Sequence, residues 1–172
     1  MTDKQMALIL ADMVVLTDSR EQRNEHIIEY LDNNNIKHQT EKLDSGDYSF
    51  ILPNYPELNL DKLVIIEKKN SLDEISQNFT KGRDRFTREF ERVPEGTNIH
   101  LVIENTTWKK LINGSYRSKL PPNSFMASLL SFSIRYDIKT WFVGKDESAV
   151  LIYKILYYEL FERLKNMREV EL

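Results

Sequence analysis

The sequence of 172 residues contains no cysteine. Disulfide bonds, thiolate catalysis and cysteine-ligated zinc are therefore excluded. The first fifteen residues lack a basic segment ahead of an apolar run and include Asp3 and Asp12, so they do not resemble a signal peptide. No apolar run approaches the roughly 18 residues that a membrane-spanning helix needs. From these absences we expect an intracellular protein, cytoplasmic or nucleoid-associated, without a membrane segment.

Internal repeats, low-complexity segments and linker-like stretches are also lacking. A chain of this length is the size of one domain and can bury a core without disulfides. Its hydrophobic fraction of 41% and charged fraction of 30% are typical of a globular protein. We therefore expect residues 1–172 to form a single domain.

Positive net charge is lacking as well, because the formal net charge is −3. Proteins that bind nucleic acid usually carry a basic surface, so this total argues against such a partner. The charges are unevenly distributed, however. Residues 105–136 include no acidic residue, and five basic residues crowd positions 81–92. This distribution permits a face that binds DNA.

Short apolar runs alternate with helical spacings along the chain. Strands are expected at residues 13–17, 37–42, 48–52, 63–69, 100–103 and 140–143. Helices are expected at residues 25–34, 71–79, 84–92, 121–136 and 148–167, and the second opens with the capping pattern Ser71-x-x-Glu74. This alternation predicts an α/β fold with a mixed central β-sheet flanked by helices.

Two opposite charges stand near the end of the strand expected at residues 63–69. Glu67 and Lys69 are two residues apart, so both project from one face of the strand, whereas Lys68 points to the other face. Similar charges occur where a strand simply runs out into solvent. Three residues alone do not decide between a site and a solvated strand end.

A further acid, Asp47, follows Gly46 at the start of the strand expected at residues 48–52. An acid on one strand with Glu-x-Lys on the next resembles the arrangement of restriction-type nucleases. Two carboxylates can hold Mg²⁺ through oxygen ligands and leave positions for water and a phosphate oxygen. The metal lowers the pKa of its water, and the lysine ammonium positions this water and stabilises developing negative charge. Mn²⁺ is expected to substitute for Mg²⁺.

Several ordered elements resemble the nuclease domain of the xeroderma pigmentosum group F family of structure-specific endonucleases. The family signature is GD, a spacer, E-R-K and, after three intervening residues, D. It stands here as Gly46-Asp47, Glu67-Lys68-Lys69 and Asp73. A D-x-R-E element stands as Asp18-Ser19-Arg20-Glu21, and a glycine-arginine element stands as Gly82-Arg83. The order of strands and helices is similar from about Val14 to Lys165.

The resemblance implies a restriction-endonuclease-like α/β fold and a Mg²⁺-dependent endonuclease that hydrolyses DNA phosphodiester bonds. Branched or flapped DNA is the substrate class that it implies, in a recombination, repair or resolvase role. We expect a stand-alone form without the helix-hairpin-helix motifs that follow this region in many members. Lys68 stands where the family has arginine, which keeps a charge for an ion pair or the DNA backbone but not bidentate pairing.

The resemblance also implies roles for individual residues. The expected metal ligands are Asp47, Glu67 and Asp18, and Asp18 is a direct ligand or an outer-shell acid of the metal site. Lys69 is expected to act on the attacking water, and Asp73 to complete the catalytic site. The residues expected to contact DNA are Arg20, Lys68, Arg83, Arg85, Lys109 and Lys110.

Structural roles remain open for some of these residues. Asp18 suits a turn or a helix cap ahead of residues 25–34. Asp73 lies in the first turn of a helix, where an acid gains roughly 0.3–1 kcal/mol from the helix dipole. It is also four residues after Lys69, close enough to hold that ammonium. Arg83 and Arg85 suit a solvated helix face.

The last expected helix, residues 148–167, carries more apolar surface than one core needs. Its first stripe consists of Ala149, Ile152, Ile155, Leu156, Leu160 and Leu164. A second stripe beside it consists of Tyr153, Tyr157 and Phe161. Together with the family resemblance, this surplus predicts a homodimer formed through the helix.

The alternative function is a catalytically inactive module that binds DNA or a partner protein through the same fold. Inactive relatives usually lose the acids or the lysine of the site. Here Asp47, Glu67 and Lys69 are all present, although unpaired charges in a buried site cost stability. This retention favours the enzyme.

Overall fold

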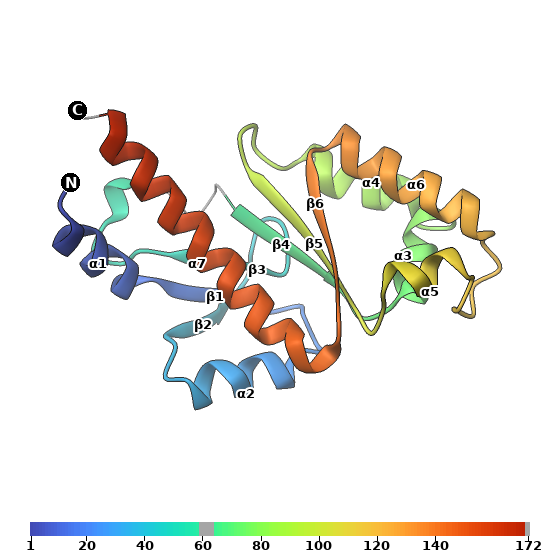
Figure 1. Ribbon diagram of the computed structural model, residues 1–172, viewed down its shortest axis with the longest axis horizontal. Coiled ribbons are helices and arrows are strands. Elements are labelled where there is room, and N and C mark those ends of the chain that lie inside the picture. Colours follow the sequence, from blue (N-terminus) through green and yellow to red (C-terminus); the bar gives the residue numbers. More distant parts are fainter. Residues whose placement is uncertain (59–63, 171–172) are drawn as a thin grey trace.

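Six strands form one mixed sheet in the computed structural model, which describes residues 1–58 and 64–170 (Figure 1). The strands are β1 (Val14–Asp18), β2 (His38–Glu41), β3 (Tyr48–Ile51), β4 (Val64–Lys69), β5 (Asn98–Glu104) and β6 (Ile138–Val143). Their order across the sheet is β2-β1-β3-β4-β5-β6. β3 runs antiparallel to both of its neighbours, and the other pairs are parallel. The mixed sheet predicted from the sequence is confirmed.

Helices cover both faces of this sheet. One face carries α1 (Asp3–Asp12), α2 (Glu25–Asn33) and α7 (Lys145–Val170). The other carries α3 (Leu72–Phe79), α4 (Arg83–Glu91), α5 (Trp108–Ile112) and α6 (Pro122–Arg135). Figure 1 shows these two groups on opposite sides of the strands. A short 3₁₀ helix, η1 (Pro56–Leu58), precedes β4.

The side chains of β4 alternate between the two cores. Ile66 packs in the core beneath α1, α2 and α7, whereas Ile65 packs in the core beneath α3 to α6. Because side chains alternate along a strand, Glu67 and Lys69 share the α3–α6 face with Ile65, and Lys68 lies on the opposite face. This is the division predicted from the two-residue spacing.

An aromatic cluster fixes α4 and α6 against the α3–α6 face. Phe86 of α4 stacks on Phe132 of α6 with ring centroids 4.9 Å apart, and it meets Phe79 of α3 edge to face at 5.8 Å. Burying one such side chain stabilises the fold by roughly 1.5–3 kcal/mol. The amino group of Lys69 lies 5.5 Å from the centroid of the Phe86 ring. The same cluster that holds α4 therefore borders the charged end of β4.

Two helices, α1 and α5, were not predicted. α1 begins with a reciprocal capping box, in which Thr2 Oγ1 accepts a hydrogen bond from Gln5 N and Gln5 Oε1 accepts one from Thr2 N. This Thr-x-x-Gln pattern is a sequence signature of a helix start. α5 is a short helix capped by Thr107. Leu63, included in the predicted fourth strand, lies outside the described residues.

Part of the second apolar stripe on the last helix packs within the chain. Tyr153 and Tyr157 of α7 are partly buried against the core cluster on which Met6 and Leu10 of α1 and Tyr30 of α2 also pack. Phe161, the third member of the stripe, is not among the residues of this cluster. No helix among the described residues is both long and apolar enough to span a membrane.

Candidate active site

The ends of three neighbouring strands bring the predicted acids together. Asp18 ends β1, Asp47 directly precedes β3, and Glu67 lies in β4. The backbone N–H of Asp18 donates to the carbonyl of Asp47 at 2.8 Å, and that of Asp47 donates to the carbonyl of Ile66 at 2.8 Å. With Lys69, the three acids line one cavity of about 310 Å³, which we call the site cavity.

Gly46 allows Asp47 to approach β4 so closely. Its φ is +73°, in the region that side chains disfavour. A Cβ at this position would also lie 3.0 Å from Cβ of Ile65 and 3.2 Å from the carbonyl oxygen of Ile66. The glycine that precedes the acid is therefore required by both backbone conformation and space.

Asp47 and Glu67 form a strained pair of carboxylates. Burial and the nearby Glu67 together raise the pKa of Asp47 well above its usual value. A hydrogen bond from Lys68 N to Asp47 Oδ2, at 2.7 Å, only partly offsets this rise. Burial likewise raises the pKa of Glu67, despite the opposing effect of Lys69. Both shifts mean that a second negative charge is costly here.

Lys69 is the cation of the site. Its Nζ lies 2.6 Å from Glu67 Oε1, and its side chain is largely buried. Burial alone would lower the pKa of Lys69, but the ion pair with Glu67 outweighs burial and the pKa is raised. The side chain is thus an ammonium at neutral pH. As an ammonium it can donate hydrogen bonds.

Asp18 was predicted to be a metal ligand or an outer-shell acid, and in the structure its carboxylate accepts several hydrogen bonds. Asp18 Oδ1 accepts from N and Nε of Arg20, and Oδ2 accepts from Arg20 Nη2 and from Leu43 N, all at 2.7–2.9 Å. Burial opposes ionisation of Asp18, yet these hydrogen bonds outweigh it and lower its pKa. Asp18 therefore orients the guanidinium of Arg20 over the site cavity.

Lys68 was predicted to contact DNA, and its burial corrects this expectation. Its side chain has 0% exposure, beneath the helices of the face opposite the site. Nζ lies 3.3 Å from Glu21 and 4.0 Å from Glu104, and it donates to the carbonyl of Arg23 and to Oδ1 of Asn70. Lys68 is an internal ion-pair partner that ties the segment after β1 to β4 and β5.

Asp73 was predicted to complete the catalytic site, and the structure gives it another partner. Its Oδ1 accepts from the backbone N–H groups of Arg117 and Ser118, both at 2.8 Å. Asp73 thereby anchors the loop between α5 and α6. The ammonium that it was expected to hold is held by Glu67 instead.

The basic residues predicted to contact DNA divide into two groups. Arg20 and Arg85 line the site cavity. Arg83, Lys109 and Lys110 are exposed and line neither that cavity nor the larger one beside it. The amino group of Lys110 donates to the carbonyl of Asn105. Of the five exposed cations, two therefore adjoin the acids.

Glu89 is a site residue that sequence reasoning missed. It lies on α4, lines the site cavity and helps to raise the pKa of Glu67. It also forms an ion pair with Arg85 at 3.4 Å. The spacing of four between Arg85 and Glu89 puts both on one helix face. Once Arg85 was considered, this spacing could have identified Glu89.

The donor set of the site fits a hard divalent cation. Within residues 1–58 and 64–170, no three His, Cys, Asp or Glu side chains are grouped to hold a metal by themselves. Mg²⁺ does not need such a cage, because it commonly binds one or two carboxylates and keeps several waters or phosphate oxygens. Asp47 and Glu67 provide that pair. Burial is the main cause that raises the pKa of both carboxyl groups, and a bound cation would favour their ionised forms.

The mixed sheet with acids and a lysine at adjoining strand ends defines a restriction-endonuclease-like fold. Residues 17–155 match the model of the ERCC4 domain family, and the chain belongs to this family. No curated protein matches the chain.

Two solved structures are similar in fold. XPF from Aeropyrum pernix is 19% identical, with a TM-score of 0.63 over 85% of this chain and 61% of that one. XPF from Aeropyrum pernix in complex with DNA is 20% identical, with a TM-score of 0.60 over 90% of this chain and 66% of that one. The chain thus spans less than two thirds of either XPF chain.

Proposed function

We propose that the protein is a metal-dependent DNA endonuclease that hydrolyses phosphodiester bonds at the site cavity. The observation that carries this proposal is the pair Asp47 and Glu67 beside the Lys69 ammonium. Two carboxylates whose pKa values are raised together, next to a cation in a cavity, are typical of a functional site. Membership of the ERCC4 domain family supports the same activity.

Each site residue has a part in this chemistry. Asp47 and Glu67 hold the metal, with Mg²⁺ expected and Mn²⁺ as a substitute. When bound, the metal supplies positive charge to the phosphate and lowers the pKa of a neighbouring water. Lys69 donates hydrogen bonds to the attacking water and to the oxygens on which charge develops. Arg20, held by Asp18, binds a phosphate oxygen at the rim of the cavity.

Branched or flapped DNA is the proposed substrate. The structural likeness to an XPF chain solved with DNA supports DNA as the ligand class. The basic residues at positions 81–92 and the acid-free stretch 105–136 supply cations on the side of the sheet that bears the site. A role in recombination, repair or resolution of DNA junctions follows from that substrate class.

A panel of labelled substrates tests the proposal. The purified protein is incubated with flap, fork, Holliday-junction, duplex and single-stranded DNA in Mg²⁺, Mn²⁺ or EDTA. We expect cleavage in both metals, none in EDTA, and faster cleavage of the branched substrates. Binding without cleavage in either metal would support the inactive DNA-binding module instead. Cleavage that persists in EDTA would contradict a metal mechanism.

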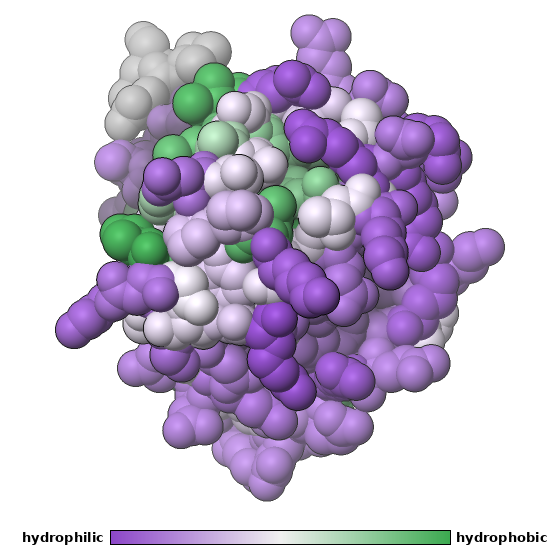
Figure 2. All heavy atoms as spheres, turned by 90° about the vertical axis from the view of Figure 1, so that its right-hand side faces the viewer, coloured by the Kyte–Doolittle hydropathy of each residue, from purple (hydrophilic) through white to green (hydrophobic). Residues whose placement is uncertain are grey.

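We also propose a homodimer, with its contact surface placed differently from the expectation based on the last helix alone. β6 is an edge strand of the sheet, and exposed apolar side chains flank it. They are Leu130 and Ile134 of α6, Trp141 of β6, and Val150 and Tyr158 of α7. Figure 2 presents the right-hand side of the molecule as drawn in Figure 1, and in the upper left of this view apolar side chains gather within a hydrophilic surround. Exposed apolar patches and edge strands commonly mark contact surfaces.

Light scattering over a range of protein concentrations tests the dimer. We expect the wild-type mass to be that of two chains, and Ile134→Asp to shift it towards one chain, because the 81% exposed Ile134 side chain would carry charge into the contact. Leu8→Asp is the matched control, since Leu8 is 55% exposed on α1. A wild-type protein of single-chain mass at every concentration would contradict the dimer.

A further inference from the structure

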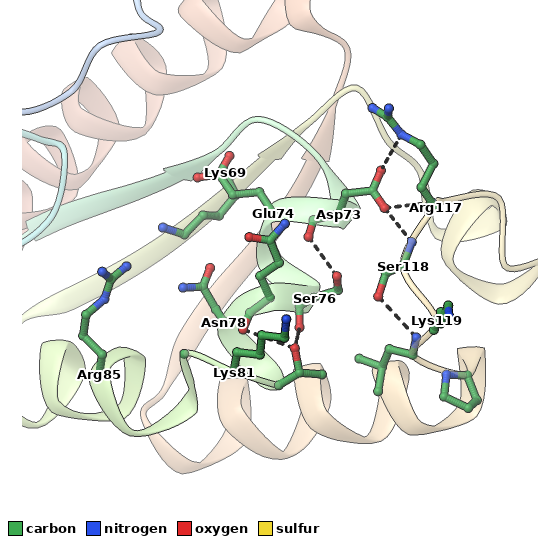
Figure 3. Close-up of a pocket in the computed structure, with 15 residues that line it drawn as sticks. Lys69, Asp73, Glu74, Ser76, Asn78, Lys81, Arg85, Arg117, Ser118 and Lys119 are labelled. Carbon is green, nitrogen blue, oxygen red and sulfur yellow. Dashed lines mark hydrogen bonds and ion pairs between the residues drawn. The ribbon is translucent and has the colours of Figure 1, made fainter.

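A second cavity of about 1260 Å³ opens beside the site cavity (Figure 3). Its walls are α3, the turn between α3 and α4, and the loop that joins α5 to α6. Lys69 and Arg85 line both cavities, so the larger one leads to the proposed point of cleavage. We call it the basic groove because five cations line it: Lys69, Lys81, Arg85, Arg117 and Lys119.

The acids of the basic groove are occupied by the protein itself. Asp73 accepts two backbone hydrogen bonds from the loop that carries Arg117, as Figure 3 shows. Glu74 Oε2 accepts from the backbone and side-chain nitrogens of Asn70, both at 2.9 Å. In contrast, neither Lys81 nor Lys119 forms an ion pair with any described residue, and both are exposed. Arg117 is exposed as well, and its Nε lies 3.5 Å from Asp73 Oδ2. The groove therefore has cations that remain available to an anionic ligand.

A polar group without a partner also lines the basic groove. Asn78 of α3 is 7% exposed, and its Oδ1 has no hydrogen-bond partner among the described residues. Leaving a buried polar group unpaired is destabilising, so each such group in a structure calls for an explanation. The pairing edge of an unpaired DNA base carries N–H donors that suit an amide oxygen.

The shape and chemistry of the groove favour one strand of nucleic acid over two. Single strands lie within positively charged grooves that follow their backbone. A duplex instead receives protein elements in its own grooves, of which the wider is about 12 Å across. The basic groove exceeds the roughly 300–1,000 Å³ of small-molecule sites, and it has no aromatic lining residue to stack on a base or a drug-like ring. Its affinity must come mainly from charge.

We propose that the basic groove binds the single-stranded arm of a branched DNA and leads it to the site cavity. Lys81, Arg117 and Lys119 contact successive phosphates. The Asn78 amide, whose Oδ1 is enclosed in this structure, rotates to accept a hydrogen bond from an unpaired base. Lys69 and Arg85 stand where this strand would enter the site. This proposal rests on the proposed nuclease function, since it makes the groove the approach to the bond that is cut.

Binding in EDTA tests the groove separately from cleavage. The probes are a fluorescent oligothymidylate and a blunt duplex of equal length, measured by anisotropy at several salt concentrations. For single strands, log K falls with log salt at a slope of about −0.7 per phosphate contact. We expect the double variant Lys81→Ala, Lys119→Ala to make the oligothymidylate slope shallower by about 1.4, since two contacts are lost. The duplex slope should not change.

The matched control is Lys4→Ala, Lys165→Ala, which removes two exposed cations from α1 and α7 on the other face of the sheet. We expect it to leave the oligothymidylate slope unchanged. An unchanged slope in the groove variant would overturn the proposal, and so would an equal change on the duplex. A cleavage-dead Glu67→Gln protein that keeps the wild-type slope would leave the groove intact, so the two proposals fail by different results.

Discussion

Asp47→Asn is expected to remove DNA cleavage and, in the absence of metal, to raise the thermal midpoint. The raised pKa of Asp47 means that folding costs free energy once its carboxylate is ionised. The neutral amide removes this cost while its oxygen can still accept the hydrogen bond from Lys68 N. A gain on the order of 1 kcal/mol corresponds to a rise of about 2–4 °C for a chain of this size. Cleavage should fall by at least about 10²-fold, because the metal loses a ligand.

The stability difference between wild type and Asp47→Asn should depend on pH, and the raised pKa of Asp47 gives the direction of this dependence. The folded-state pKa of Asp47 lies above the usual value, so stability is complete below the usual value and declines as pH rises through the raised one. Wild type and Asp47→Asn should therefore converge at acidic pH and separate towards neutral pH in calorimetric scans. Asp44→Asn, an exposed acid of the same cavity wall, is the control and should not raise the midpoint. A lower midpoint for Asp47→Asn at neutral pH would contradict the strained pair.

Lys68→Met is expected to destabilise the fold by about 3–5 kcal/mol, because Glu21 and Glu104 would lose their buried cation. This is a large share of the 5–15 kcal/mol that typically holds a domain folded. Urea denaturation measures the loss. Lys68→Arg is the control, since arginine keeps the charge and stands at this position in the resembled family signature. A Lys68→Met protein as stable as wild type would show that Lys68 is not the structural ion-pair partner described above.

The face of β4 that carries Glu67 and Lys69 could be predicted from the sequence because strand geometry is local. A two-residue spacing alone puts Glu67 and Lys69 on one face, and the glycine before Asp47 marks a backbone position that no side chain fits. The fold class could be predicted as well, since the alternation of strands and helices follows from local sequence patterns. Those local rules could not predict which residues from distant parts of the chain contact the site residues in the fold.

Three of the predicted site residues have partners in distant parts of the chain. The sequence predicted that Lys68 faces away from the site. It did not predict that Glu104, 36 positions later, would lie near Lys68 in a buried core. Asp73 lies four residues after Lys69, yet its carboxylate accepts a hydrogen bond from the loop residue Arg117, 44 residues farther along. The carboxylate of Asp18 accepts one of its hydrogen bonds from the backbone N–H of Leu43, 25 residues away. Spacing along one element says nothing about such contacts.

The unpredicted helix α1 had a similar effect on the proposed dimer. Its Thr2-x-x-Gln5 cap was visible in the sequence, but the helix has only two buried residues, so its periodicity is weak. Met6 and Leu10 of α1 pack on the same core cluster as Tyr153 and Tyr157, so part of the apolar surface of the last helix is buried within the chain. Exposed apolar side chains near the edge strand β6 are a second candidate surface.

The most direct measurement is the single-turnover rate of DNA cleavage by wild type and Lys69→Ala side by side, in Mg²⁺ and in EDTA. The site geometry predicts Mg²⁺-dependent cleavage by wild type and a loss of at least about 10²-fold in the variant, with oligothymidylate binding in EDTA largely retained. Equal cleavage by the two proteins, or cleavage by wild type in EDTA, would contradict a metal-and-lysine nuclease site formed by Asp47, Glu67 and Lys69.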